Sequence, residues 1–176
     1  RLLGLLGPRG GEASGTGRAK HAFSYVVAEG VLSEGERVFL PVLREAVRRV
    51  WGTGQGAEVV PLVFASVRLA EVLKVNNDAC RTAGAKRSAL MRVTQKQVDF
   101  VLCVAETTRP MLVIELDDQT HGRSDRRERD EFVDEACATA GLPILHVRAA
   151  RTYDAADIAN RIGGALSLVG AAGVRR

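Results

Sequence analysis

The sequence predicts an α/β fold built on a mixed β-sheet. Residues 97–104 and 111–117 are apolar, β-branched and aromatic-rich, which is typical of strands buried in a sheet. The turn between them, residues 106–110, is short enough for an antiparallel hairpin. A third such segment, residues 143–148, follows a helical stretch, so we expect it to run parallel after a right-handed crossover. Antiparallel and parallel pairs in one sheet make the sheet mixed.

One helix and one strand precede this hairpin. Ser33 and Glu36 form a capping box ahead of a run that is apolar at helical spacing, which predicts a helix over residues 34–50. Residues 58–66 have the composition of a strand. Pro61 cannot donate a ladder hydrogen bond, so this strand should lie at an edge or carry a bulge.

The middle of the chain is polar and basic. The sequence predicts a short helix over residues 67–75 and a loop with some helix over residues 76–92. From Arg68 to Lys96 there are seven Lys or Arg and two acids, a net charge of +5. Such a run is usually a solvated face, but it also suits a nucleic-acid backbone. The candidate contacts are Arg81, Lys86, Arg87, Arg92 and Lys96.

Two helices complete the second half of the chain. Residues 126–140 carry an apolar stripe at helical spacing, and Gly141 is suited to end that helix. Residues 154–169 predict the last helix. The strands and the inner stripe should share one buried core that contains Phe100, Leu102, Val113, Ile114, Phe132, Ala136 and Leu145.

Composition limits the class of protein. The chain has 176 residues, 46% hydrophobic and 26% charged, which favours one domain and excludes a disordered chain. Its net charge of +4 permits a polyanionic partner without requiring one. Three scattered cysteines without a CxxC pair exclude a disulfide framework and a zinc ribbon in this chain. Reduced thiols fit a cytoplasmic protein.

The two ends differ from the body of the chain. We expect a flexible segment over residues 1–30, a domain over 31–170 and a tail over 171–176. The chain starts with Arg1 rather than Met, so we expect a fragment or a processed product. Its apolar start, residues 2–6, is either a frayed end or the remainder of a membrane tether.

Three acidic residues lie within or at the end of the apolar strands. Asp99 lies inside the first strand of the hairpin, while Glu115 and Asp117 share one face of the second. Such carboxylates are costly without a partner, and three of them together need a cation to stay ionised. Oxygen ligands favour Mg²⁺ or Mn²⁺. The alternative is that Glu115 and Asp117 cap the next helix or pair with arginines.

Two residues that follow these acids are further candidates. His121 lies four residues after Asp117, in the loop that leaves the strand, where it either reaches the acids or is simply solvated. Arg129 heads the apolar stripe of the following helix. From there it binds the acids or a phosphate, or forms a structural ion pair.

These segments together resemble a bacterial domain family of unknown function, DUF2726, which is similar to a branch of the PD-(D/E)XK nuclease superfamily close to the very-short-patch-repair endonucleases. The resemblance covers about residues 31–168. Its specific segments are VDFVLC (98–103), VIELDDQTH (113–121), RRERDEFVDEA (126–136) and AGLPILHVR (140–148).

The resemblance implies a restriction-endonuclease-like core, a mixed central sheet flanked by helices, and a role for each matching residue. Asp99 matches the first acid and Glu115 the second, both ligands of Mg²⁺ or Mn²⁺. Asp117 occupies the position of the usual lysine, which is a departure that puts cleavage in question. His121 fits a subtype with E-x-D and a following histidine.

Two more residues enter through this resemblance. Lys96 is a candidate to replace the missing lysine, although an unbroken strand would point it away from Asp99. Glu36 matches an acid of the family's first helix that can join the metal site. Its role in the capping box is the favoured interpretation.

The leading hypothesis is therefore a Mg²⁺-dependent phosphodiesterase that acts on DNA, with RNA as a second substrate class. Asp99, Glu115, Asp117 and the carbonyl of Leu116 are the candidates to hold the ion, and His121 to act as general base. Arg129 would bind a phosphate oxygen. The alternatives are a non-catalytic nucleic-acid-binding module and a structural or interaction domain.

Overall fold

The computed structural model describes residues 25–52, 59–117 and 124–173 of the chain. The sheet has four strands in the order β1-β2-β3-β4. Their bounds are β1 Leu62–Arg68, β2 Gln97–Cys103, β3 Pro110–Asp117 and β4 Ile144–Arg148. The first three strands are antiparallel neighbours, and β4 runs parallel to β3. The predicted α/β class with a mixed sheet is therefore confirmed.

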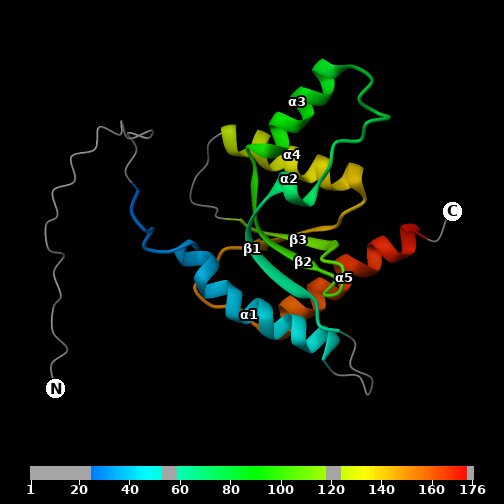
Figure 1. The fold of residues 1–176 in the computed structure, drawn as a ribbon. Helices are drawn as coiled ribbons and strands as arrows, with labels where there is room; N and C mark the ends of the chain where they lie inside the picture. The colour runs from blue at the N-terminus through cyan, green and yellow to red at the C-terminus, as the bar shows by residue number, and fades with distance from the viewer. Residues whose placement is uncertain (1–24, 53–58, 118–123, 174–176) are drawn as a thin grey trace, which may run out of the picture.

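Helices lie on both faces of this sheet (Figure 1). Their bounds are α1 Glu34–Trp51, α2 Leu69–Val72, α3 Ala83–Thr94, α4 Ser124–Ala140 and α5 Ala155–Gly173. Helices α1 and α5 pack together on one face, and α2, α3 and α4 lie on the other. None of the helices in the described ranges is long and apolar enough to span a membrane.

Most predicted elements are found within a few residues of their expected bounds, but the region around β1 differs. The strand starts at Leu62, directly after Pro61, and runs on to Arg68. It is an edge strand, as the proline predicted. The helix predicted over 67–75 is only four residues long, because the strand continues into that segment. Helix α5 extends to Gly173, beyond its predicted end at 169.

The largest difference lies in residues 76–92, which we expected to be a loop with some helix. Residues Ala83–Thr94 form a helix of twelve residues. The Thr82 side chain caps it by accepting a hydrogen bond from the Ala85 N–H, 3.1 Å away. The helix has no wide apolar stripe, and only Val93 is buried. The hydrophobic pattern therefore did not indicate it.

The core is divided by the sheet into two clusters, where we expected one. The cluster under α1 and α5 includes Phe39, Phe100, Leu102 and Ile114, all fully buried. The Phe39 ring contacts the rings of Phe100 and Tyr153, with centroids 5.6 Å and 4.8 Å away.

The second cluster lies under α2, α3 and α4. It includes Val101, Val113, Val133 and Cys137. Three residues of the predicted core are only partly buried: Phe132, Ala136 and Leu145. Leu145 packs against the first cluster and Phe132 against the second. The strand faces were predicted correctly, and both clusters are needed to bury them.

Gly141 ends α4 as predicted, in the left-handed conformation with φ 68°. The Gly141 N–H donates to the Ala138 carbonyl, and the Leu142 N–H donates to the Cys137 carbonyl. This is the Schellman pattern, which favours glycine at the left-handed position. The turn leads the chain directly into β4.

We expect Phe39→Ala to lower the free energy of unfolding by about 3–5 kcal/mol, because it leaves a cavity between α1, β2 and Tyr153. Denaturant unfolding followed by circular dichroism measures this loss. The neighbouring Val38 is 38% exposed, and Val38→Ala should cost less than about 1 kcal/mol. Equal losses for the two variants would contradict the assignment of the core.

Candidate acidic site

Asp99 and Glu115 lie side by side where β2 and β3 separate. The β2–β3 pairing ends at Phe100 and Ile114, and the two acids are the next residue on each strand. Beyond that pair, the Asp99 carboxylate accepts a hydrogen bond from the Leu116 N–H at 2.7 Å. The carboxylate thus replaces a backbone acceptor of the ladder. The Asp99 carboxyl group also lies close enough to Glu115 to act on the protonation of that side chain.

The contact between two carboxyl groups changes the protonation of Glu115. Burial, together with the charge of Asp99, raises the pKa of Glu115 from 4.5 to about 8. The positive charge of His146 opposes this rise. At neutral pH the pair therefore retains a proton in the metal-free protein, since two adjacent carboxylates cannot both ionise cheaply.

Asp117 contacts a histidine, His146, that we did not single out in the sequence. Its carboxylate is 3.0 Å from His146 Nδ1, and Asp134 of α4 is 2.9 Å from His146 Nε2. Burial alone would lower the pKa of His146, but the hydrogen bonds to Asp117 and Asp134 raise it above its ordinary value. A protonated ring can donate to both carboxylates, so the chain Asp117–His146–Asp134 joins β3, β4 and α4.

This chain lies next to the acid pair. His146 of β4 is the register partner of Glu115 in the parallel β3–β4 pair. Cys137, one turn after Asp134 on α4, has a pKa raised to about 11 by burial and by the charges of Asp134 and Glu115. Strands β2, β3 and β4 and helix α4 therefore contribute polar groups to one region.

The structure brings together Asp99 and Glu115, and it ties Asp117 to His146. Among the residues that the structure describes, no group of three or more His, Cys, Asp or Glu side chains has a geometry that could hold a metal ion. Asp99 and Glu115 thus form a two-carboxylate site, which can hold a hard cation only with help from backbone oxygens, water or a ligand.

Glu36 forms the capping box that we favoured. Its carboxylate accepts from the Ser33 N–H at 2.6 Å, and its own N–H donates to the Ser33 hydroxyl at 3.3 Å. The same carboxylate accepts a hydrogen bond from the Ser66 hydroxyl at 3.4 Å. Ser66 lies between the β1 residues that pair with Phe100 and Val98, so it is level with Asp99. The N-terminus of α1 is thus linked, through Ser66, to β1 at the level of Asp99.

The other predicted residues fall into two groups. Lys96 is half-buried just before β2, and its carbonyl accepts from the Leu69 N–H. None of the ion pairs between described residues joins Lys96 to Asp99 or Glu115. The loop with His121 lies outside the described residues. Arg129 belongs to α4, but its side chain is outside the described part.

The five predicted nucleic-acid contacts all lie on or beside α3. Arg81 precedes the helix, Lys86 and Arg87 are exposed on it, and Lys96 follows it. Arg92 places its guanidinium 4.0 Å from the centre of the Phe132 ring, so it joins α3 to α4.

Sequence reasoning missed His146 and Asp134. His146 is a polar residue inside an apolar strand, which is the same signal that pointed to Asp99. Its importance was not evident because both of its partners are distant in the sequence. Asp134 had no signal, since a helix that carries many charges normally exposes them.

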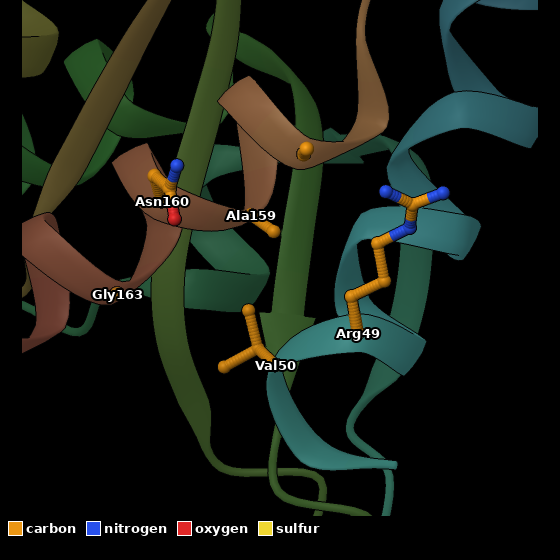
Figure 2. Close-up of a pocket in the computed structure, with 6 residues that line it drawn as sticks. Arg49, Val50, Ala159, Asn160 and Gly163 are labelled. Atoms are coloured by element: carbon orange, nitrogen blue, oxygen red, sulfur yellow. The ribbon is translucent and has the colours of Figure 1, made fainter. Parts of the chain in front are cut away.

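A pocket between α1 and α5 is separate from the acids. It has a volume of about 390 Å³ and is lined by Arg49 and Val50 of α1 and by small residues of α5 (Figure 2). Those two helices cover the opposite face of the sheet from α4. This pocket therefore does not belong to the acidic site.

The raised pKa of Glu115 predicts how stability depends on pH in the metal-free protein. The folded state keeps a proton that the unfolded chain releases near pH 4.5, so stability should fall as the pH rises from 4.5 to about 8. The slope from one group is at most about 1.4 kcal/mol per pH unit. Urea unfolding in EDTA measures it, and Glu115→Gln should flatten it. An unchanged slope in this variant would contradict the shared proton.

Comparison with known proteins gives a family without a function. No curated protein and no solved structure matches the chain. The family model described as a protein of unknown function, DUF2726, matches residues 28–166. This range includes the whole sheet and the acidic site, and the chain therefore belongs to the DUF2726 family.

Proposed function

We propose that this protein is a Mg²⁺-dependent phosphodiesterase that cleaves DNA, with Mn²⁺ as an equivalent ion. The observation that carries the proposal is the contact between the carboxyl groups of Asp99 and Glu115. Folding brings two acids together against their mutual repulsion. Such an arrangement is more typical of functional sites than of structural ones.

The donor groups of this pair fit a hard divalent cation. Mg²⁺ is commonly held by one or two carboxylates, while water and substrate phosphates complete its shell. Asp99 is held in place by the Leu116 N–H. A cation that binds Glu115 would displace the proton of its carboxyl group into solvent. The Leu116 carbonyl is the third candidate ligand. The bound ion would supply an activated water and stabilise charge on the phosphoryl oxygens.

His146 supplies positive charge in a site that lacks the usual lysine. Asp117 occupies the lysine position, and its charge is compensated by the His146 ring 3.0 Å away. The protonated ring also lies across from Glu115 in the register, where it favours the ionised form of that acid. The raised pKa of His146 favours the protonated ring, which positions Asp117 by a hydrogen bond. His121 remains the candidate for the general base.

A second candidate function is nucleic-acid binding without cleavage. Asp117 is engaged by His146, so it does not add a third carboxylate to the pair. A site with two acids and an aspartate, Asp117, at the position of the usual lysine is also what an inactive nuclease-like domain would retain. Measuring binding and cleavage separately distinguishes the two functions.

Nicking of supercoiled plasmid in Mg²⁺ or Mn²⁺ tests the proposal. Asp99→Asn and Glu115→Gln should each lower the nicking rate by about 100-fold or more, because removing even supporting groups of a metal site costs 10-fold to 100-fold. The control is Glu106→Gln, an exposed acid in the β2–β3 turn, which should nick at the wild-type rate.

Nicking that persists at the wild-type rate in both site variants would overturn the assignment of the acid pair. Metal-dependent binding without any nicking would favour the second function instead. Addition of EDTA must abolish nicking by the wild-type protein, since the mechanism depends on the cation.

Substitution of the two histidines tests their different roles. His121→Ala should lower the nicking rate on the order of 10²-fold to 10⁴-fold with DNA binding unchanged, as expected for a general base. His146→Gln removes a positive charge beside Glu115 and should shift the pH profile of nicking, not only its rate. A full rate in His121→Ala would leave that residue without a catalytic role.

A further inference from the structure

Helix α3 belongs to an arm that stands out from the sheet. The arm comprises residues 69–96, which connect β1 to β2, and α3 projects beyond α2 and α4 (Figure 1). Of the twelve residues in α3, only Val93 is buried. A helix that buries so little of its surface gains little from packing, so its exposure needs another explanation.

The arm is nevertheless fixed at its base. Leu69 is fully buried, and its N–H donates to the Lys96 carbonyl at 2.9 Å. Arg92 stacks on Phe132 of α4, which attaches the last turn of α3 to the rest of the protein. Lys96, at the end of the arm, is three residues before Asp99. The arm is therefore held beside the acid pair.

The exposed part of the arm carries uncompensated positive charge. Helix α3 contains no acidic residue, and Lys86 and Arg87 are exposed in its middle. No ion pair between described residues involves Lys86, Arg87 or Arg81. By contrast, Arg48 and Arg49 of α1 both pair with Glu45. The charge of the arm is thus available to a polyanion.

The residue types in the arm favour a duplex over a single strand. Proteins that hold single strands stack bases on aromatic side chains, and no aromatic residue lies between Phe64 and Phe100. Instead, α3 exposes Leu90 (52%) and Met91 (50%), one turn after the two cations. Apolar side chains in the major groove can contact the methyl group of thymine.

The dimensions agree with this interpretation. A helix of twelve residues is about 18 Å long and about 10 Å across. The major groove of B-form DNA is about 12 Å wide and admits a helix, whereas the major groove of A-form RNA is too narrow.

We propose that α3 enters the major groove of duplex DNA, where Lys86 and Arg87 bind the phosphates at its edges. If the acid pair cleaves DNA, as proposed above, its substrate is a DNA duplex; this part of the inference rests on the proposed function. The binding itself does not depend on cleavage.

Fluorescence anisotropy in EDTA tests this binding without cleavage. The probes are one labelled DNA duplex of about 20 base pairs, roughly two helical turns, its single strand and the matching RNA duplex. The DNA duplex should bind most tightly. Lys86→Ala with Arg87→Ala should weaken that binding about 10-fold or more and reduce the salt slope by about 2, since two phosphate contacts are lost.

The matched control is Arg37→Ala with Arg44→Ala on α1. These two arginines are also exposed on a helix, and they belong to the face of the sheet away from the arm. The control should bind within twofold of the wild type, and both double variants should give the same circular dichroism spectrum. Equal weakening by the two variants would mean that only net charge matters, and it would overturn the proposal.

Three other outcomes would also overturn it: tighter binding of the single strand, equal binding of the RNA duplex, and stronger competition by phosphatidylserine vesicles than by unlabelled DNA duplex. The nuclease proposal fails separately. A protein that binds the DNA duplex through α3 but never nicks keeps this inference and loses the phosphodiesterase function. A protein that nicks only single strands keeps the phosphodiesterase function and loses this inference.

Discussion

The contact between Asp99 and Glu115 is the constraint on which the rest of the site depends. The β2–β3 ladder ends just before the two acids, and the Asp99 carboxylate takes the next backbone donor, the Leu116 N–H. Burial and the charge of Asp99 favour the protonated form of Glu115, and a bound cation would favour the ionised form. The neighbouring strands therefore hold Glu115 in its protonated form at neutral pH in the metal-free protein.

Of the charged side chains around the acid pair, some contact a side chain of opposite charge and others have no such contact among the described residues. Asp117 and Asp134 both contact His146, and a protonated ring offsets one of their two negative charges without any ligand. The cations of the α3 arm have no such partners among the described residues. A polyanion that binds the arm would reach the acids through a cation rather than directly, since carboxylates repel phosphates. The two charge patterns are thus complementary parts of one proposed phosphodiester site.

The sheet could be predicted from the sequence because β2, β3 and β4 are continuous apolar runs, and the two acids were visible as exceptions within them. Helix α3 could not be predicted by its hydrophobic pattern, since it is stabilised by the Thr82 cap and by helix-favouring residues rather than by burial. His146 was missed because its pairing with Asp117 depends on the parallel register of β3 and β4. A register between distant segments leaves no local signal in one sequence.

The measurement that tests the acid pair most directly is the titration of the Glu115 carboxyl group by ¹³C nuclear magnetic resonance, with the metal-free protein. Glu115→Gln assigns the signal, and Asp99→Asn removes the charge of the partner. The shared proton predicts a midpoint near pH 8 that moves to lower pH in Asp99→Asn and on addition of Mg²⁺. A midpoint near the ordinary value of 4.5, unchanged in Asp99→Asn, would contradict the account.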